Sequence, residues 1–219
     1  MRAPQAATVG GVRRRAPRGQ GELLRAAILR AAAELLSETG REEDVSIRAV
    51  AERVGVTPPS IYLHFTDKDA LLDAVCVEAF ADFHDVMQQA GASSDDAVPA
   101  LRAQGLAYVD FALSRPEHYR LMFMRRPGQD LDMPTEAEVT AVAGLSSVID
   151  TLRRAQEQGV VDAADDPVRV AMSLWAAAHG VAALLIAKPH FPWGDRQELV
   201  DRVLTMSLRG VSRPVLKRA

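Results

Sequence analysis

Residues 46–72 read SIRAVAERVGVTPPSIYLHFTDKDALL, and this stretch decides the fold of the N-terminal part of the chain. Ser46 stands where a side chain caps a short helix, and Gly55 stands where that helix ends. Thr57 caps the next helix, and Pro58 occupies its first position, where a missing N–H costs no hydrogen bond. Small and apolar residues face the inside of the pair: Val50, Ala51, Val54, Val56 and Ile61. Two short helices that meet at a glycine with such an interior form a helix-turn-helix.

Elsewhere in the chain, apolar residues recur at spacings of three and four, whereas the alternation typical of strands is almost absent. The pattern predicts an all-α fold. A first amphipathic helix is expected near 22–39, ending at Gly40. A long helix begins at Thr66 or Asp67 and runs to about Gln89. Further helices are expected near 97–113, 116–124, 135–158, 166–187 and 195–210.

The composition is that of an ordinary globular protein, with 48% hydrophobic and 25% charged residues among 219. Cys76 is the single cysteine, so neither an intrachain disulfide nor a cysteine cluster for zinc can form. The Arg-rich segment 1–20 lacks the apolar stretch of an export signal. We therefore expect a cytoplasmic protein.

Residues 170–187, VAMSLWAAAHGVAALLIA, carry no formal charge and are about the minimum length for a membrane span. The stretch is rich in alanine, contains Ser173, His179 and Gly180, and has no neighbouring span to pair with. Helices that are apolar on every side also occur in protein cores. We expect a buried helix and no association with a membrane.

The formal net charge is −3, which by itself does not indicate nucleic-acid binding. Its distribution is slightly asymmetric, because there are 11 Lys and Arg against 10 Asp and Glu through residue 75, and the remainder is acidic. Residues 1–21 are expected to form a disordered arm, which is either a solvated tail or a segment that follows DNA phosphates. The arginines that precede any acidic residue are Arg2, Arg13, Arg14, Arg15 and Arg18.

The stretch 46–72 resembles the DNA-binding signature of the TetR/AcrR family of bacterial transcriptional regulators, and the likeness extends over roughly 22–75. The residues at the family's spacing are Tyr62, His64, Phe65, Lys68 and Leu71. The resemblance implies a helix-turn-helix DNA-binding domain over 22–66. It also implies a helical ligand-binding and dimerisation domain over 67–219.

Two further segments resemble the branch of this family whose C-terminal domain is named for a Trp-His-Gly (WHG) motif. They are residues 115–123, RPEHYRLMF, and Trp175 with His179 and Gly180. The function implied is that of a sequence-specific transcriptional repressor, released from its operator by a small apolar or amphipathic ligand.

The expected DNA contacts begin with Thr57, Pro58, Pro59 and Ser60, which open the recognition helix. The first residues of such a helix reach base edges in the major groove. Ser60 can bond a base or a phosphate. The two prolines have no N–H and supply only apolar contact, for example to a thymine methyl group, so direct reading of bases is expected to be sparse.

Four more residues are candidate DNA contacts. Tyr62 and Lys68 are expected on phosphates, because a phenol hydroxyl and an ammonium lie near the start of a long helix whose dipole favours anions. The alternatives are a half-buried rim residue for Tyr62 and a solvated charge for Lys68. His64 is either a contact or a core residue, and Arg48 either touches the DNA backbone or is solvated. Phe65 is assigned to the core.

The candidate ligand pocket is a set of apolar and aromatic residues in the C-terminal part of the chain. Its members are Tyr108, Phe111, Tyr119, Met122, Phe123, Trp175 and His179. The alternative is that these residues are simply core. Trp175 and His179 are four residues apart, so they share one helix face and offer a ligand two polar groups beside apolar area.

A homodimer is expected from the last two long helices. A strip of small residues would let another helix approach closely: Ala176, Gly180, Ala183 and Ala187. The family resemblance implies that these helices pair with their copies into a four-helix bundle. Apolar residues consistent with this are Leu199, Val203, Leu204, Met206 and Leu208. Such a dimer presents two recognition helices to a pseudo-palindromic operator in double-stranded DNA.

Two other classes of protein fit the sequence less well than a transcriptional regulator does. A helical enzyme is disfavoured, because the sequence has no phosphate-binding G-x-x-x-x-G-K, dinucleotide fingerprint, H-E-x-x-H or nucleophile elbow. The five histidines are scattered and Cys76 lies among apolar residues, so no catalytic residue, metal site or cofactor is expected. A nonspecific DNA-packaging protein would use the same phosphate contacts without a pocket, and the acidic C-terminal half disfavours it.

Overall fold

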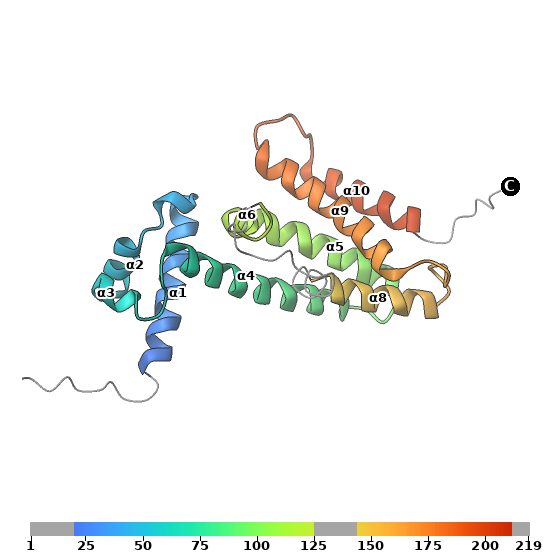
Figure 1. Cartoon of the computed structure of the whole chain (residues 1–219). Coiled ribbons are helices and arrows are strands. Elements are labelled where there is room, and N and C mark those ends of the chain that lie inside the picture. The colour runs from blue at the N-terminus through green and yellow to red at the C-terminus, as the bar shows by residue number, and fades with distance from the viewer. Residues whose placement is uncertain (1–19, 125–143, 212–219) are drawn as a thin grey trace, which may run out of the picture.

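The computed structural model describes residues 20–124 and 144–211, and every regular element in these ranges is a helix. A small N-terminal group of helices lies at one end, and the long helix α4 runs from it into a larger helical bundle (Figure 1). The prediction of an all-α fold is confirmed. Most of the arm expected over 1–21 lies outside the described residues, and the first helix already begins at Gln20.

The N-terminal group contains α1 (Gln20–Thr39), the short 3-10 helix η1 (Glu42–Asp44), α2 (Ile47–Val54) and α3 (Pro58–Ile61). The end of α2 follows the sequence signals closely. The Ser46 hydroxyl accepts a hydrogen bond from the Ala49 amide at 3.1 Å, and Gly55 terminates the helix in the left-handed region at φ 77°. Because a side chain is strained there, glycine suits this turn.

The start of α3 differs in one detail from the expected cap. Thr57 precedes the helix in an extended conformation, but its side chain does not bond a backbone amide. Instead the Thr57 and Ser60 hydroxyls lie 3.1 Å apart and bond each other. Pro58 occupies the first position, as predicted.

The core of the N-terminal group extends beyond the helix-turn-helix itself. Ile28 of α1, Val50 of α2 and Ile61 of α3 are each fully buried. Leu71 on the first turns of α4 (Lys68–Gly91) and Leu121 on α6 (Pro116–Phe123) belong to the same cluster. The N-terminal group is therefore closed by helices that also belong to the larger bundle.

The larger bundle consists of α4 (Lys68–Gly91), α5 (Ala97–Ser114), α6 (Pro116–Phe123), α8 (Leu145–Glu157), α9 (Pro167–Ala187) and α10 (Arg196–Val211). Asp67 caps α4 by accepting from the Ala70 amide at 2.8 Å. Each of these helices except α8 lies within a few residues of its predicted range. The first part of the helix predicted over 135–158 falls on 125–143, outside the described residues, and α8 begins at Leu145.

Helix α9 is the one described helix with the length and hydropathy of a membrane span, with a mean hydropathy of 1.9 over its most apolar window. The sequence predicted a buried helix, and 33% of that window is buried within the single chain. One side packs between α5, α8 and α10. The other side leaves Met172 and Leu184 about half exposed, at 49% and 51%.

We predict that Gly55→Ala lowers the free energy of unfolding by about 1 kcal/mol, because alanine is strained at φ 77° although no atom lies within 4 Å of its new methyl group. Gly210→Ala is the matched control, since Gly210 is helical and equally open. There alanine should leave stability unchanged or raise it by about 0.5 kcal/mol. Urea unfolding of both variants measures the difference, and equal effects would contradict the backbone explanation.

Candidate functional site

The recognition helix α3 and the turn after it present a nearly continuous exposed surface. Thr57, Pro58 and Pro59 are exposed, and Ser60 is half-buried, with its hydroxyl bonded to that of Thr57. Tyr62 is 54% exposed. The four residues predicted to open the recognition helix therefore lie together on the outside of the N-terminal group, with their polar atoms bonded to each other rather than to the core.

Leu63 is a surface residue that sequence reasoning missed. Its side chain is 83% exposed, the largest value among the exposed large apolar residues of the described chain. It directly follows Tyr62 and belongs to no core cluster. The signal available in the sequence was its position outside the apolar stripe that buries Ile61 and Phe65. An exposed leucine beside exposed prolines extends the apolar part of this surface.

The other predicted contacts are placed less uniformly. Arg48 on α2 is exposed, His64 is half-buried, and Phe65 is buried as predicted. The Arg25 guanidinium lies over the Phe65 ring at 5.2 Å from its centroid, a favourable cation–π arrangement. Because His64 is half-buried, its contact with DNA stays a prediction.

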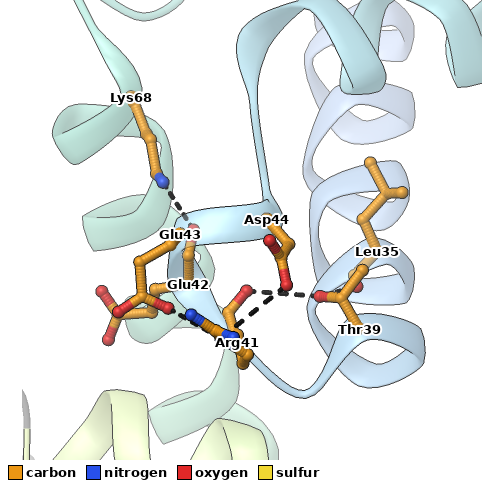
Figure 2. Close-up of polar contacts among 7 residues, drawn as sticks. All are labelled: Leu35, Thr39, Arg41, Glu42, Glu43, Asp44 and Lys68. Atoms are coloured by element: carbon orange, nitrogen blue, oxygen red, sulfur yellow. Dashed lines mark hydrogen bonds and ion pairs between the residues drawn. The ribbon is translucent and has the colours of Figure 1, made fainter.

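Lys68 has a structural contact that the sequence did not reveal. Its ammonium donates a hydrogen bond to the backbone carbonyl of Glu42, across 26 positions of sequence. Figure 2 shows the lysine reaching from the start of α4 to η1, where Arg41 pairs with Glu43 at 3.4 Å and with Asp44 at 3.9 Å. Lys68 therefore ties the connection between α1 and α2 to the first turn of α4.

The charges around η1 favour the ionised form of Glu43. A backbone hydrogen bond within Glu43, the Arg41 guanidinium and the Lys68 ammonium together hold the pKa of its carboxyl below the ordinary value. Thr39 closes the preceding helix end by donating to the Leu35 carbonyl at 2.8 Å (Figure 2). The segment between α1 and α2 is thus held by polar bonds at both ends.

The seven residues predicted to line a ligand pocket are brought together by α5, α6 and α9. Their rings pack against one another in tilted contacts, with 5.1 Å between the centroids of Tyr119 and Phe123 and 5.6 Å between those of Trp175 and His179. Phe111 joins through Phe83 of α4, at 5.1 Å. Met122 belongs to the same buried cluster.

The polar atoms in this cluster form a closed network. The Trp175 indole N–H donates to the Tyr108 hydroxyl at 3.1 Å. The hydroxyls of Tyr108 and Tyr119 lie 2.9 and 2.7 Å from Nδ1 of His179. Each of these groups therefore has a partner within the protein.

The network is electrically neutral. Burial raises the pKa of the Tyr108 hydroxyl and raises that of Tyr119 to about 12. Burial also lowers the pKa of His179. At neutral pH both tyrosines are protonated and the imidazole is uncharged, so the network offers dipoles and no charge.

A small cavity lies beside this network, between α5, α8, α9 and α10, with a volume of about 40 Å³ open to the centre of a water-sized molecule. Tyr108 and Trp175 line it, whereas the other five predicted residues do not. Among the lining residues that sequence reasoning missed are Gln104 of α5 and Ser207 of α10. Leu204, predicted for a dimer seam, is buried and also lines the cavity.

Helix α6 connects the two cores. Leu121 belongs to the N-terminal core, whereas Tyr119 and Met122 belong to the core of the larger bundle. The Cys76 thiol of α4 bonds the Leu121 carbonyl at 3.8 Å. Helix α6 therefore places side chains in both cores, as α4 does.

Two family models match the chain. Residues 28–75 match the model described as bacterial regulatory proteins, tetR family, and residues 101–207 match the model described as tetracyclin repressor-like, C-terminal domain. Together they cover the helix-turn-helix and most of the larger bundle.

Similar proteins include the tetracycline repressor protein class D of Escherichia coli, 40% identical over 72 residues, which are 33% of each chain. The match thus spans about a third of that repressor. An uncharacterized HTH-type transcriptional regulator of Bacillus subtilis, YobS, is 26% identical over 83% of this chain and 87% of its own. A solved protein of unknown function from Rhodococcus sp. RHA1 superposes with a TM-score of 0.73 at 27% identity, covering 87% of this chain and 96% of its own.

We predict that the free energy of unfolding falls as the pH drops below about 6.5, the ordinary pKa of histidine. The folded pKa of His179 lies below its unfolded value, so the unfolded chain binds more protons in that interval and is favoured there. His179→Asn keeps an acceptor for the tyrosine hydroxyls but does not titrate, and it should reduce this pH dependence.

The exposed His190 supplies the control, since His190→Asn should leave the pH dependence as it is. Urea unfolding at several pH values between 5 and 8 measures all three proteins. Part of the dependence should survive in His179→Asn, because burial also lowers the pKa of His118. An unaltered dependence in His179→Asn would contradict the assignment.

Proposed function

Because the chain belongs to the tetR family of bacterial regulatory proteins, we propose that it is a cytoplasmic transcriptional repressor whose homodimer binds a pseudo-palindromic operator. A small apolar or amphipathic ligand releases it. The observation that carries the proposal is the exposed surface of α3 within a segment that matches the family's N-terminal model. The matched models describe regulatory proteins rather than enzymes, in agreement with the expectation of a non-enzymatic chain.

DNA binding is supported by the chemistry of the exposed residues. The first turn of α3 offers hydroxyls and two prolines, and Tyr62 and Leu63 follow at its end. In a major groove the apolar groups would meet thymine methyl groups, while the Tyr62 hydroxyl would donate to a phosphate. Most of the affinity would then come from the DNA backbone and from shape.

Lys68 can serve both the fold and the DNA. An ammonium has three N–H donors, and the bond to the Glu42 carbonyl uses one of them. The start of α4 also presents the positive end of a helix dipole. Lys68 and the exposed Arg48 are therefore proposed as phosphate contacts, with Lys68 positioned by η1.

Dimerisation through α9 and α10 is supported by the apolar side chains that the single chain leaves exposed. Met172 and Leu184 on α9 are about half exposed, and Met206 on α10 is 67% exposed. Between the α9 pair lie the small residues Ala176 and Gly180. A second copy of the same two helices would cover this face, which also explains why α9 is apolar on all sides. We also propose that the C-terminal domain is of the WHG type, because residues 115–123 and the positions of Trp175, His179 and Gly180 resemble that branch of the family.

Ligand control is supported by the position of α6. A ligand in the C-terminal cavity would touch Tyr108 and Trp175, which are bonded through His179 to Tyr119 on α6. Release requires that the ligand bind the non-operator conformation more tightly, because equal affinity for both conformations shifts nothing. Helices α6 and α4 are the proposed levers.

We predict that the protein retards its own upstream DNA in a gel-shift assay and that scrambled competitor DNA does not displace it. Equal competition by both DNAs would instead support a packaging protein, and absence of binding would contradict a DNA-binding function.

Tyr62→Phe should weaken binding to every sequence by roughly five- to tenfold, the effect of one lost hydrogen bond of about 1 kcal/mol. The tyrosine is exposed, so its replacement should leave urea stability unchanged.

We predict that Leu184→Glu converts the dimer into monomers and weakens operator binding, because a carboxylate would be buried in the α9 face without a partner. Sedimentation velocity measures the oligomeric state. Val77→Glu is the matched control, since Val77 is 68% exposed on α4, away from α9 and α10. A dimer that survives Leu184→Glu at micromolar concentration would contradict this interface.

A further inference from the structure

Gln104 is a polar residue in the middle of α5 that is 1% exposed and lines the C-terminal cavity. Glutamine is rarely buried to this degree, and a buried amide needs partners for both its N–H and its carbonyl groups. What its two ends contact therefore decides what the cavity can bind.

The hydrogen bonds around Gln104 define the orientation of its amide. Nε2 donates to the Ser147 hydroxyl at 2.7 Å and to the Met87 carbonyl at 3.4 Å. The Ser147 hydroxyl donates its own hydrogen bond to the same Met87 carbonyl, at 3.1 Å. Because the Met87 carbonyl only accepts, the nitrogen end of the amide is the end that can bond it, and this contact assigns the orientation of the amide.

The oxygen end of the amide is left without a partner. Within the described residues, Gln104 Oε1 is buried and has no hydrogen-bond donor in reach. By contrast, the polar atoms of Trp175, Tyr108 and His179 already bond one another. The group in this cavity that lacks a hydrogen-bond partner is therefore Gln104 Oε1, which needs a donor, whereas Trp175 and His179 already have partners.

We propose that the cavity binds a neutral, mainly apolar molecule carrying a hydroxyl or N–H donor, and that Gln104 determines this specificity by accepting its hydrogen bond. The walls around Gln104 are apolar, including Leu101, Leu145 and Val148. No Lys, Arg or protonated His lines the cavity within the described ranges, so a carboxylate would be buried unpaired beside a carbonyl oxygen. That such a molecule acts as the effector rests on the proposed function, whereas its binding does not.

The test compares phenol with toluene, which have similar shapes but differ in one donor, by ligand-observed NMR titration of the full chain. Phenol loses more hydration than toluene, so the informative quantity is the ratio of the two Kd values in different variants. In Gln104→Met, which keeps the side-chain length, the preference for phenol over toluene should fall by about tenfold relative to the unmodified chain. Benzoate should not bind at concentrations that saturate phenol.

Gln89→Met is the matched control, because Gln89 is exposed on α4 and its replacement should leave the preference unchanged. Ala178→Val provides a second variant that leaves Gln104 intact. Ala178 is 4% exposed and lines the cavity, so two added methyl groups should weaken phenol binding at least fivefold.

Equal preferences in Gln104→Met and the unmodified chain would overturn the proposal, as would binding of benzoate or undiminished phenol binding by Ala178→Val. Absence of phenol binding by the unmodified chain would overturn it as well. The gel-shift assay separates this inference from the proposed function. If the chain discriminates between phenol and toluene but does not bind the operator, the ligand site is supported and the repressor function is contradicted. If it binds the operator but does not discriminate between the two ligands, only the ligand site is contradicted.

Discussion

Helix α6 is the constraint on which the arrangement of the two parts depends. Pro116 begins it, and the preceding Arg115 ends α5 while pairing with Asp82 of α4 at 2.9 Å. Within two turns the helix places Leu121 in one core and Tyr119 in the other, with 2% and 1% exposure. Helix α4 likewise contributes buried side chains to both cores, so α6 and α4 together join the two parts of the chain.

The C-terminal bundle separates its polar atoms into a satisfied group and an unsatisfied one. Tyr108, Tyr119, Trp175 and His179 form a neutral network of mutual hydrogen bonds. The network holds α5, α6 and α9 together. One helical turn earlier on α5 than Tyr108, Gln104 leaves a buried acceptor unmet. Rigidity and recognition are thus assigned to neighbouring but different residues of the same helix.

Much of the fold could be predicted from local signals. The cap at Ser46, the left-handed turn at Gly55 and the proline at the start of α3 lie where the sequence indicated. The helix predicted over 97–113 is observed over Ala97–Ser114. The same reasoning gathered the aromatic residues of the bundle into one cluster but did not distinguish the two that line the cavity from those that fill the core. Pocket lining depends on which side of a packed side chain remains open, and periodicity carries no such information.

The roles of Lys68 and Gln104 show where local reasoning ends. The partner of Lys68 is 26 residues away on η1, and the amide of Gln104 is oriented by Ser147, 43 residues away. By itself, the sequence determined the helices, the caps at Ser46 and Gly55, the helix-turn-helix and the apolar faces, because those depend on residues within one or two turns of each other. Only the tertiary structure decided which buried polar groups are satisfied and which face of α9 is left exposed. Those outcomes depend on contacts between helices that are distant in the chain, where geometry rather than residue type determines whether a hydrogen bond forms.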